Sequence, residues 1–191
     1  EPRAVVAQLA VTKALRLQQI VTGFAKDDKG DIHKLPCPRL SVLSDLLEDI
    51  TPGNKVIVWA SFKENYKDIA KVCDDLKLEY RQIHGEIAQK DREEAMNDFR
   101  TNPAVRVMIA NQAAAGVGIS LIEASYCIYY SKDFRLENDI QSEARNYRGG
   151  SEMHEKITRI DLIAKGTIDE LVSEALFNKQ SISDKILNWQ L

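Results

Sequence analysis

Short apolar segments rich in β-branched residues recur along the middle of this chain, and each is followed by a polar segment. The first, Lys55–Ala60, reads Lys-Val-Ile-Val-Trp-Ala, which is typical of a strand buried on both faces of a parallel sheet. Further predicted strands lie at 80–83, 105–110, 126–130 and 156–164. Strands that alternate with helices through short connections predict an α/β fold with a doubly wound, mainly parallel sheet and helices on both faces.

Signals for helix starts follow several of these strands. Ser61 and Glu64 stand three residues apart directly after the first strand, which is the spacing of a capping box, and Ser120 and Glu123 repeat it later in the chain. A third box lies at Thr167–Glu170. We therefore expect a helix to begin at each of these three places.

The chain of 191 residues has the length of one domain of ordinary size. The predicted segments are a helical extension with a polar turn at 1–54, a sheet domain at 55–166 and a C-terminal helical segment at 167–191. Within the extension, helical spacing over 4–22 and 40–50 flanks a polar turn at 26–31, the expected tip of a hairpin. The sequence starts at Glu1 without a methionine, so we expect a piece of a longer protein.

Charge and composition argue against several kinds of partner. The formal net charge is −3, so no overall positive field attracts nucleic acid, and any such binding must use a local patch. The three cysteines and three histidines are scattered without metal-ligand spacing, and we predict no metal site and reduced, intracellular cysteines. No apolar run reaches about 18 residues and no secretory leader is visible, so we expect no membrane partner.

The segment Gln141–Gly150, which reads Gln-Ser-Glu-Ala-Arg-Asn-Tyr-Arg-Gly-Gly, predicts an anion site. On a helix, Gln141, Arg145 and Arg148 stand at i, i+4 and i+7 and line one outward-facing stripe. The planar guanidinium of arginine is always charged and can donate two parallel hydrogen bonds to phosphate oxygens. The apolar stripe expected to face the core consists of Leu136, Ile140, Ala144 and Tyr147. A solvated surface helix is the alternative interpretation of the polar stripe.

A glycine-containing loop follows the predicted strand at 105–110. In Gly116-Val-Gly118-Ile-Ser120, backbone amides and the expected helix start converge on one spot, which outlines a phosphate cradle. A tight turn requires the same glycines and is the alternative. The third position of a Gly-x-Gly-x-x-Gly motif is Leu121, and no Gly-x-x-x-x-Gly-Lys-Ser/Thr phosphate loop occurs in the sequence. A chain of this kind that handles ATP would bring only half of the nucleotide site.

Taken in order, these motifs resemble the C-terminal RecA-like lobe of superfamily-two helicases, most closely the Swi/Snf-type DNA translocases. Gln141–Gly149 is similar to the sixth motif of that family, residues 114–121 to the fifth and Val56–Phe62 to the fourth. The pattern is completed by Ile83–Gly85, Asn138–Gln141 and Gly166–Glu170. The departures from it are Ser120 in place of asparagine, Gln112 in place of threonine and Phe134 in place of tryptophan.

The resemblance implies one RecA-like lobe of a two-lobe, ATP-dependent motor on double-stranded DNA. ATP and Mg²⁺ would be held mainly by an N-terminal RecA-like lobe of the same parent chain, and the present chain alone would be inactive. Arg148 would be the principal arginine finger and Arg145 its neighbour, with Gln141, Gly116 and Gly118 on the nucleotide side. The residues implied to contact the DNA backbone are Ser61, Gly85, Gln112 and Ala113.

A second function stays open, namely a non-catalytic RecA-like module that binds nucleic acid or protein and uses its arginines in a structural ion network. The apolar segment Leu171–Trp189 would suit a partner-binding face, although packing against the sheet or the first lobe also fits it. A phosphate loop upstream in the parent gene would separate the two functions. The expected location is intracellular, in the cytoplasm for a bacterial or phage-borne protein and in the nucleus for a eukaryotic one.

Overall fold

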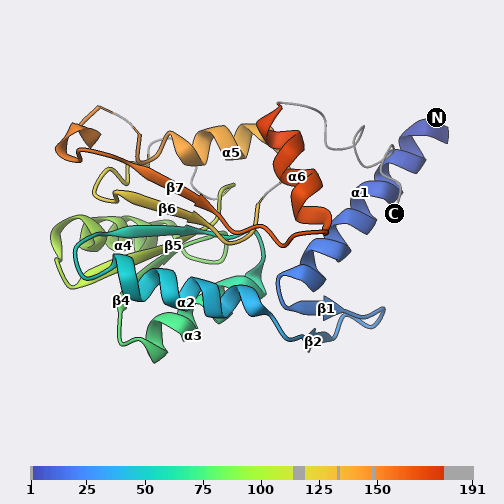
Figure 1. The fold of residues 1–191 in the computed structure, drawn as a ribbon, viewed down its shortest axis with the longest axis horizontal. Coiled ribbons are helices and arrows are strands. Elements are labelled where there is room, and N and C mark those ends of the chain that lie inside the picture. The colour runs from blue at the N-terminus through green and yellow to red at the C-terminus, as the bar shows by residue number, and fades with distance from the viewer. Residues whose placement is uncertain (1, 114–118, 133, 148, 179–191) are drawn as a thin grey trace. The chain divides into compact units, whose positions relative to one another are not determined.

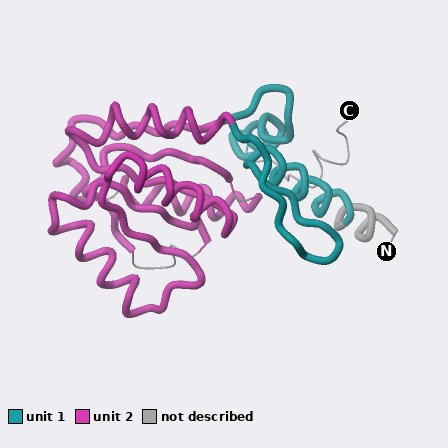
Figure 2. Tube along the Cα trace, turned by 90° about the horizontal axis from the view of Figure 1, so that it is seen from below, with its two compact units in different colours: residues 1–37, 163–191 teal, residues 38–162 magenta. Residues whose placement is uncertain are grey.

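The computed structural model describes residues 2–113, 119–132, 134–147 and 149–178 (Figure 1). The chain divides into two compact units (Figure 2). The units are a sheet unit, Pro38–Leu162, and a terminal unit that combines Glu1–Cys37 with Ile163–Leu191. The predicted extension over 1–54 is therefore split, because its second helix belongs to the sheet unit.

Five parallel strands form the sheet of the sheet unit, in the order β4-β5-β3-β6-β7. The strands are β3 (Val56–Trp59), β4 (Glu79–Ile83), β5 (Val105–Ala110), β6 (Tyr126–Tyr129) and β7 (Thr158–Asp161). The central strand β3 pairs with β5 and β6, so that Val58 lies between Ile109 and Ile128. Because all pairings are parallel, the carboxyl ends of the five strands meet at one edge of the sheet.

Helices cover both faces of this sheet, which confirms the predicted doubly wound α/β fold (Figure 1). They are α2 (Pro38–Ile50), α3 (Lys63–Asp75), α4 (Gln89–Thr101) and α5 (Leu136–Glu143). Side chains alternate along β3, so Val56 and Val58 pack in one cluster with α2 and α3. Ile57 and Trp59 pack on the opposite face with Phe99 of α4. Both faces of β3 are buried, as its continuous apolar sequence predicts.

Two of the three expected capping boxes are absent. Helix α3 begins after Phe62, which provides no side-chain cap, and Ser61 lies one residue too early for the role. Between Ser120 and β6 the described residues form turns and no helix. The carboxylate of Glu123 instead pairs with Arg100 at 3.1 Å. Capping boxes are local signals, and here contacts with other elements take up the side chains of Ser61 and Glu123.

The terminal unit contains α1 (Pro2–Val21), β1 (Phe24–Lys26), β2 (Ile32–Lys34) and α6 (Ile168–Phe177). Strands β1 and β2 pair antiparallel, which confirms the hairpin predicted around residues 26–31. The third predicted helix start is confirmed, because Thr167 is the N-cap of α6 and accepts a hydrogen bond from the amide of Asp169 at 3.2 Å. The carboxylate of Glu170 accepts one from the amide of Gly166 at 3.0 Å. Helix α1 contacts both α6 and β1 within this unit.

Candidate functional site

The candidate site lies along the edge of the sheet unit at which all five strands end. The residues at these ends are His84–Gly85 after β4, Asn111–Ala113 after β5, Ala60–Ser61 after β3, Ser131–Lys132 after β6 and Leu162 after β7. The amide of Asn111 donates to Ile83 O, and the amide of Tyr130 donates to Trp59 O, both at 2.9 Å. The sheet thus brings residues from distant parts of the sequence to one edge, where open parallel sheets commonly bind ligands.

Three of the four predicted DNA contacts are accessible at this edge. Gly85 is exposed, with no atom within 4 Å of the position a Cβ would take. Ser61 is half-buried, its amide donates to Ser131 Oγ at 2.9 Å, and its hydroxyl donates to Ser131 O at 3.4 Å. Ala113 is exposed, and its amide donates to Asn111 Oδ1 at 2.9 Å. A phosphate at this edge would therefore have to replace the internal acceptors of the Ser61 hydroxyl and the Ala113 amide.

The arginine-bearing segment departs from the predicted helix. Helix α5 ends at Glu143, and Arg145 follows it in a turn with only 8% of its surface exposed. Its Nη1 donates to Ile119 O at 3.4 Å, and its carbonyl O accepts from Leu121 N at 2.9 Å. The predicted outward stripe is therefore wrong for Arg145, while Gln141 is exposed on α5. The predicted site residues that lie outside the described residues are Arg148, Gly116 and Gly118.

The buried face of α5 is polar, which is the reverse of the predicted arrangement. Ile140 is 48% exposed and Tyr147 74% exposed, although both belong to the stripe expected to face the core. Asp139 is 7% exposed and Ser142 is fully buried. The apolar spacing was misleading because the partners of α5 in the sheet unit are charged and hydroxyl-bearing side chains.

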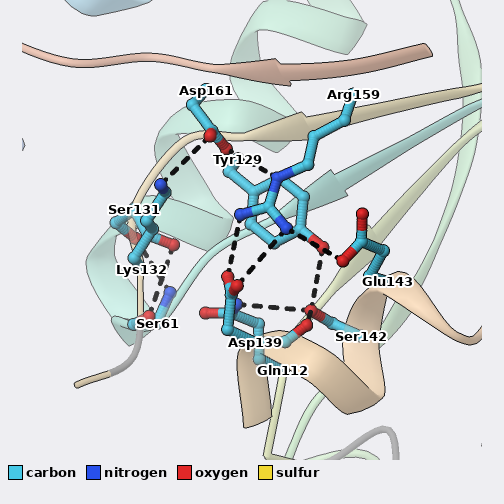
Figure 3. Close-up of polar contacts among 10 residues, drawn as sticks. All are labelled: Ser61, Gln112, Tyr129, Ser131, Lys132, Asp139, Ser142, Glu143, Arg159 and Asp161. Atoms are coloured by element: carbon cyan, nitrogen blue, oxygen red, sulfur yellow. Dashed lines mark hydrogen bonds and ion pairs between the residues drawn. The ribbon is translucent and has the colours of Figure 1, made fainter. Parts of the chain in front are cut away.

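Arg159 of β7 is the main partner of this buried face (Figure 3). Its Nη2 lies 2.9 Å from Asp139 Oδ1 and its Nη1 3.3 Å from Asp139 Oδ2, a two-pronged ion pair. Its Nη1 also lies 3.6 Å from Glu143 Oε2, and its Nε 3.2 Å from Asp161 Oδ1. The guanidinium carbon sits 4.0 Å from the centre of the Tyr129 ring. The charge is thus neutralised by acids from two elements and supported by an aromatic face.

Ser142 receives the second set of contacts on α5. Its Oγ lies 2.9 Å from the Tyr129 hydroxyl, 2.8 Å from Asp139 O and 3.4 Å from Gln112 Nε2. The single serine proton goes to Asp139 O, so the Tyr129 hydroxyl donates to Ser142. Burial is the largest cause of a raised pKa of Tyr129, which keeps this donor protonated. Gln112 is buried and directed at α5, so its side chain is not presented to a ligand in this arrangement.

His84 directly follows β4 and precedes the exposed Gly85. Its ring stacks on Tyr66 with centroids 4.5 Å apart, and its Nε2 lies 3.1 Å from Gln82 Oε1, which places the proton on Nε2. Burial lowers the pKa of His84, which favours the neutral ring. The end of β4 is therefore held by a neutral aromatic stack.

Sequence reasoning missed the residues that hold α5, above all Arg159 and Asp161. A weak signal was available, since both are charged and stand at i and i+2 in a predicted strand, which puts them on the same face. Nothing in the local sequence indicates that Arg159 pairs with Asp139, which lies 20 positions earlier in the chain. Tyr129 was assigned to a strand, but its hydroxyl contact to α5 has no local signature.

The described part of the chain contains no group of three or more histidine, cysteine or acidic side chains placed to hold a metal ion. The donors described along the carboxyl edge are backbone amides and hydroxyls, which suit anions. None of the helices in the described ranges is both long and apolar enough to cross a membrane.

A five-stranded parallel sheet with helices on both faces is the arrangement of a RecA-like lobe. The family model described as helicase conserved C-terminal domain matches residues 38–150. The chain therefore belongs to this family, and its relatives identify it as a C-terminal lobe of the Swi/Snf type, as the motifs predict.

Among curated proteins, the chain is 30% identical over 151 residues to the DNA repair and recombination protein RDH54 of Saccharomyces cerevisiae, which covers 78% of this chain and 16% of the relative. It is 32% identical over 134 residues to the SWI/SNF-related matrix-associated actin-dependent regulator of chromatin subfamily A containing DEAD/H box 1 homolog of Caenorhabditis elegans, covering 70% and 13%. The chain thus spans about a sixth or less of the length of these relatives.

A solved structure with the same fold is the C-terminal part of the Fun30 ATPase domain. It matches with a TM-score of 0.66 and 23% sequence identity, covering 71% of this chain and 44% of that one. The likeness confirms the RecA-like arrangement of the sheet unit.

Proposed function

We propose that this chain is the second motor lobe of an ATP-dependent translocase that moves on double-stranded DNA. The observation that carries the proposal is the extent of the family match, residues 38–150. The match covers most of the sheet unit and ends with the arginine-bearing segment. The names of the relatives support a role on DNA, since they describe DNA repair, recombination and chromatin regulation. The parent protein would therefore work where duplex DNA is, in the nucleus if it is eukaryotic.

On the nucleotide side, an N-terminal lobe of the parent would hold most of the ATP and Mg²⁺. Bound MgATP would supply the γ-phosphoryl group that is transferred to water, with ADP as the leaving group. Arg148 would stabilise the charge that develops on this group, an effect typically worth on the order of 10³ to 10⁵ in turnover. Arg145 would brace the segment that carries Arg148 through its contacts to Ile119 and Leu121. Gln141, exposed on α5, and the loop with Gly116 and Gly118 would complete this side of the site.

On the DNA side, the accessible carboxyl edge would contact backbone phosphates. The candidate contact groups are the backbone at the exposed Gly85 and Ala113 and the hydroxyl of Ser61, and the Ser61 hydroxyl would exchange its hydrogen bond to Ser131 O for one to a phosphate. Contacts of this kind position a protein on DNA and do not read its sequence. Gln112 would act indirectly, through its hydrogen bond to Ser142 of α5.

The proposal is tested by adding a negative charge at this edge of the full-length parent. Gly85→Asp should raise the duplex concentration that half-maximally stimulates ATP hydrolysis by about fivefold, because a carboxylate near a phosphate costs roughly 1 kcal/mol in water. Gly53→Asp is the matched control, since Gly53 is also exposed with no atom within 4 Å of its Cβ position but precedes β3, at the opposite edge.

Equal duplex requirements for the two variants would contradict the DNA side of the proposal. A parent protein with no duplex-stimulated hydrolysis at all would contradict the motor function itself. That outcome would favour the other function considered from the sequence, a non-catalytic binding module.

A further inference from the structure

The orientation of α5 depends on few contacts. The helix has eight residues, a length at which an isolated helix is not stable in water. Its buried residues are Asp139 and Ser142, and Ile140 on its other side is largely exposed. Apolar packing therefore contributes little to the placement of α5, and the polar contacts of its inner face must set it.

Arg159 makes contacts at both ends of this helix. Its two Nη atoms reach Asp139 in the first turn, at 2.9 and 3.3 Å, and Nη1 also reaches Glu143, the last residue of α5, at 3.6 Å. Asp139 and Glu143 are one helical turn apart and so lie on the same side. A planar fork with several donors can hold two acids in fixed directions at once, whereas a lysine ammonium cannot.

Arg159 is itself held in place from the sheet side (Figure 3). Its Nε contacts Asp161 Oδ1 at 3.2 Å, and Asp161 Oδ2 pairs with Lys132 Nζ at 3.1 Å. The guanidinium carbon of Arg159 also lies 4.0 Å from the centre of the Tyr129 ring. The Arg159 side chain thus starts on β7, is held at Nε by Asp161 and lies on the Tyr129 ring of β6. These contacts direct its guanidinium group toward α5.

We propose that Arg159 is a positioning residue for ATP hydrolysis, which acts by setting the orientation of α5 and hence of the arginine-bearing segment that directly follows it. The inference rests on the proposed function, since it concerns the arrangement of Arg145 and Arg148. Arg159 lies beyond the residues matched by the family model, which end at Gly150. A small displacement of a group that acts on the reacting atoms can cost about a hundredfold in rate.

The test compares two matched variants of the full-length parent, Arg159→Met and Arg81→Met. Arg81 also lies on an edge strand, β4, and pairs with an aspartate of a neighbouring helix, Asp98 of α4, at 2.6 Å. The two arginine side chains are similarly exposed, 26% for Arg159 and 34% for Arg81. Methionine keeps much of the apolar stem of each side chain and removes the charge. The Arg81–Asp98 pair lies at the opposite edge of the sheet from β7, so Arg81→Met controls for the loss of an ion pair alone.

At saturating duplex, Arg159→Met should lower kcat about tenfold or more while the KM for ATP changes little, because the lost interaction matters at the transition state. Arg81→Met should leave both parameters unchanged, although both variants should lower Tm. Arg159→Lys should give an intermediate kcat. If Arg159→Met does not fold, Arg159→Lys carries the test, and a kcat equal to wild type in this variant overturns the inference.

Equal kcat values for Arg159→Met and Arg81→Met would also overturn it. An Arg148→Ala variant measured alongside separates this outcome from failure of the proposed function. A loss of turnover in Arg148→Ala with normal turnover in Arg159→Met removes only the positioning role. Normal turnover in Arg148→Ala removes the proposed arginine-finger role on which the positioning role depends.

Discussion

The hydroxyl of Ser142 shows how much of the candidate site depends on single buried polar groups. It is the hydrogen-bond partner of the Tyr129 hydroxyl at 2.9 Å, and both residues are buried. Ser142→Ala would remove the acceptor and leave the buried Tyr129 hydroxyl without this hydrogen-bond partner. We expect a loss of about 1–3 kcal/mol in the free energy of unfolding, measured by urea denaturation.

The control is the double variant Ser142→Ala with Tyr129→Phe, which removes both polar groups. Because the phenylalanine ring needs no partner, the double variant should lose clearly less stability than the sum of the two single variants. Additive losses, within about 0.5 kcal/mol, would show that the two hydroxyls do not depend on each other in the folded protein.

Single residues at the strand ends were well predicted, and those after α5 were not. Ser61 and Gly85 were placed at the carboxyl edge because each follows a predicted strand within two residues. Arg145 was predicted to point outward, but it is buried against Ile119. The sequence contains no signal that ends α5 at Glu143, since neither glycine nor proline follows until Gly149.

Among the secondary-structure elements, the strands were predictable because both faces of β3 must be apolar to lie between two layers of helices. Helix α5 was assigned the wrong buried face because its partners, Tyr129 of β6 and Arg159 of β7, come from other parts of the chain. Helical periodicity identifies the more apolar side of a helix. It does not identify which side meets a charged strand.

Helix α2 gives a prediction at the scale of elements. Leu43 and Leu47 are fully buried in the same cluster as Val56 and Val58, so α2 is part of the core of the sheet unit. A fragment of residues 38–162 should therefore unfold cooperatively in urea. A fragment of residues 55–162, cut at the boundary predicted from sequence, should not.

The shorter fragment should not unfold cooperatively because the loss of α2 removes a large part of the free energy that stabilises a domain. Each buried leucine removed costs about 2–5 kcal/mol, and a whole domain is stable by about 5–15 kcal/mol. Circular dichroism during the titration reports the transition. Equal urea midpoints for the two fragments would show that α2 is dispensable and that the boundary at residue 55 is the better one.

For the molecule as a whole, the sequence predicted the most general property correctly, namely a RecA-like lobe of the Swi/Snf type, because several motifs occur in a fixed order. The phosphate-loop motif is absent from the sequence, which is consistent with a lobe that completes a nucleotide site begun elsewhere. The net charge of −3 is likewise consistent with DNA contacts confined to one edge.

The central claim is that this lobe contributes an arginine to ATP hydrolysis, and the duplex-stimulated ATPase rate of the full-length parent beside its Arg148→Ala variant tests it most directly. Arg148→Lys serves as the control that keeps a charge but lacks the two-pronged geometry. We expect Arg148→Ala to lower kcat by roughly a hundredfold or more with an unchanged Tm, and Arg148→Lys to recover only part of the rate. A kcat in Arg148→Ala equal to that of the wild type would contradict the claim and leave the arginines a structural role.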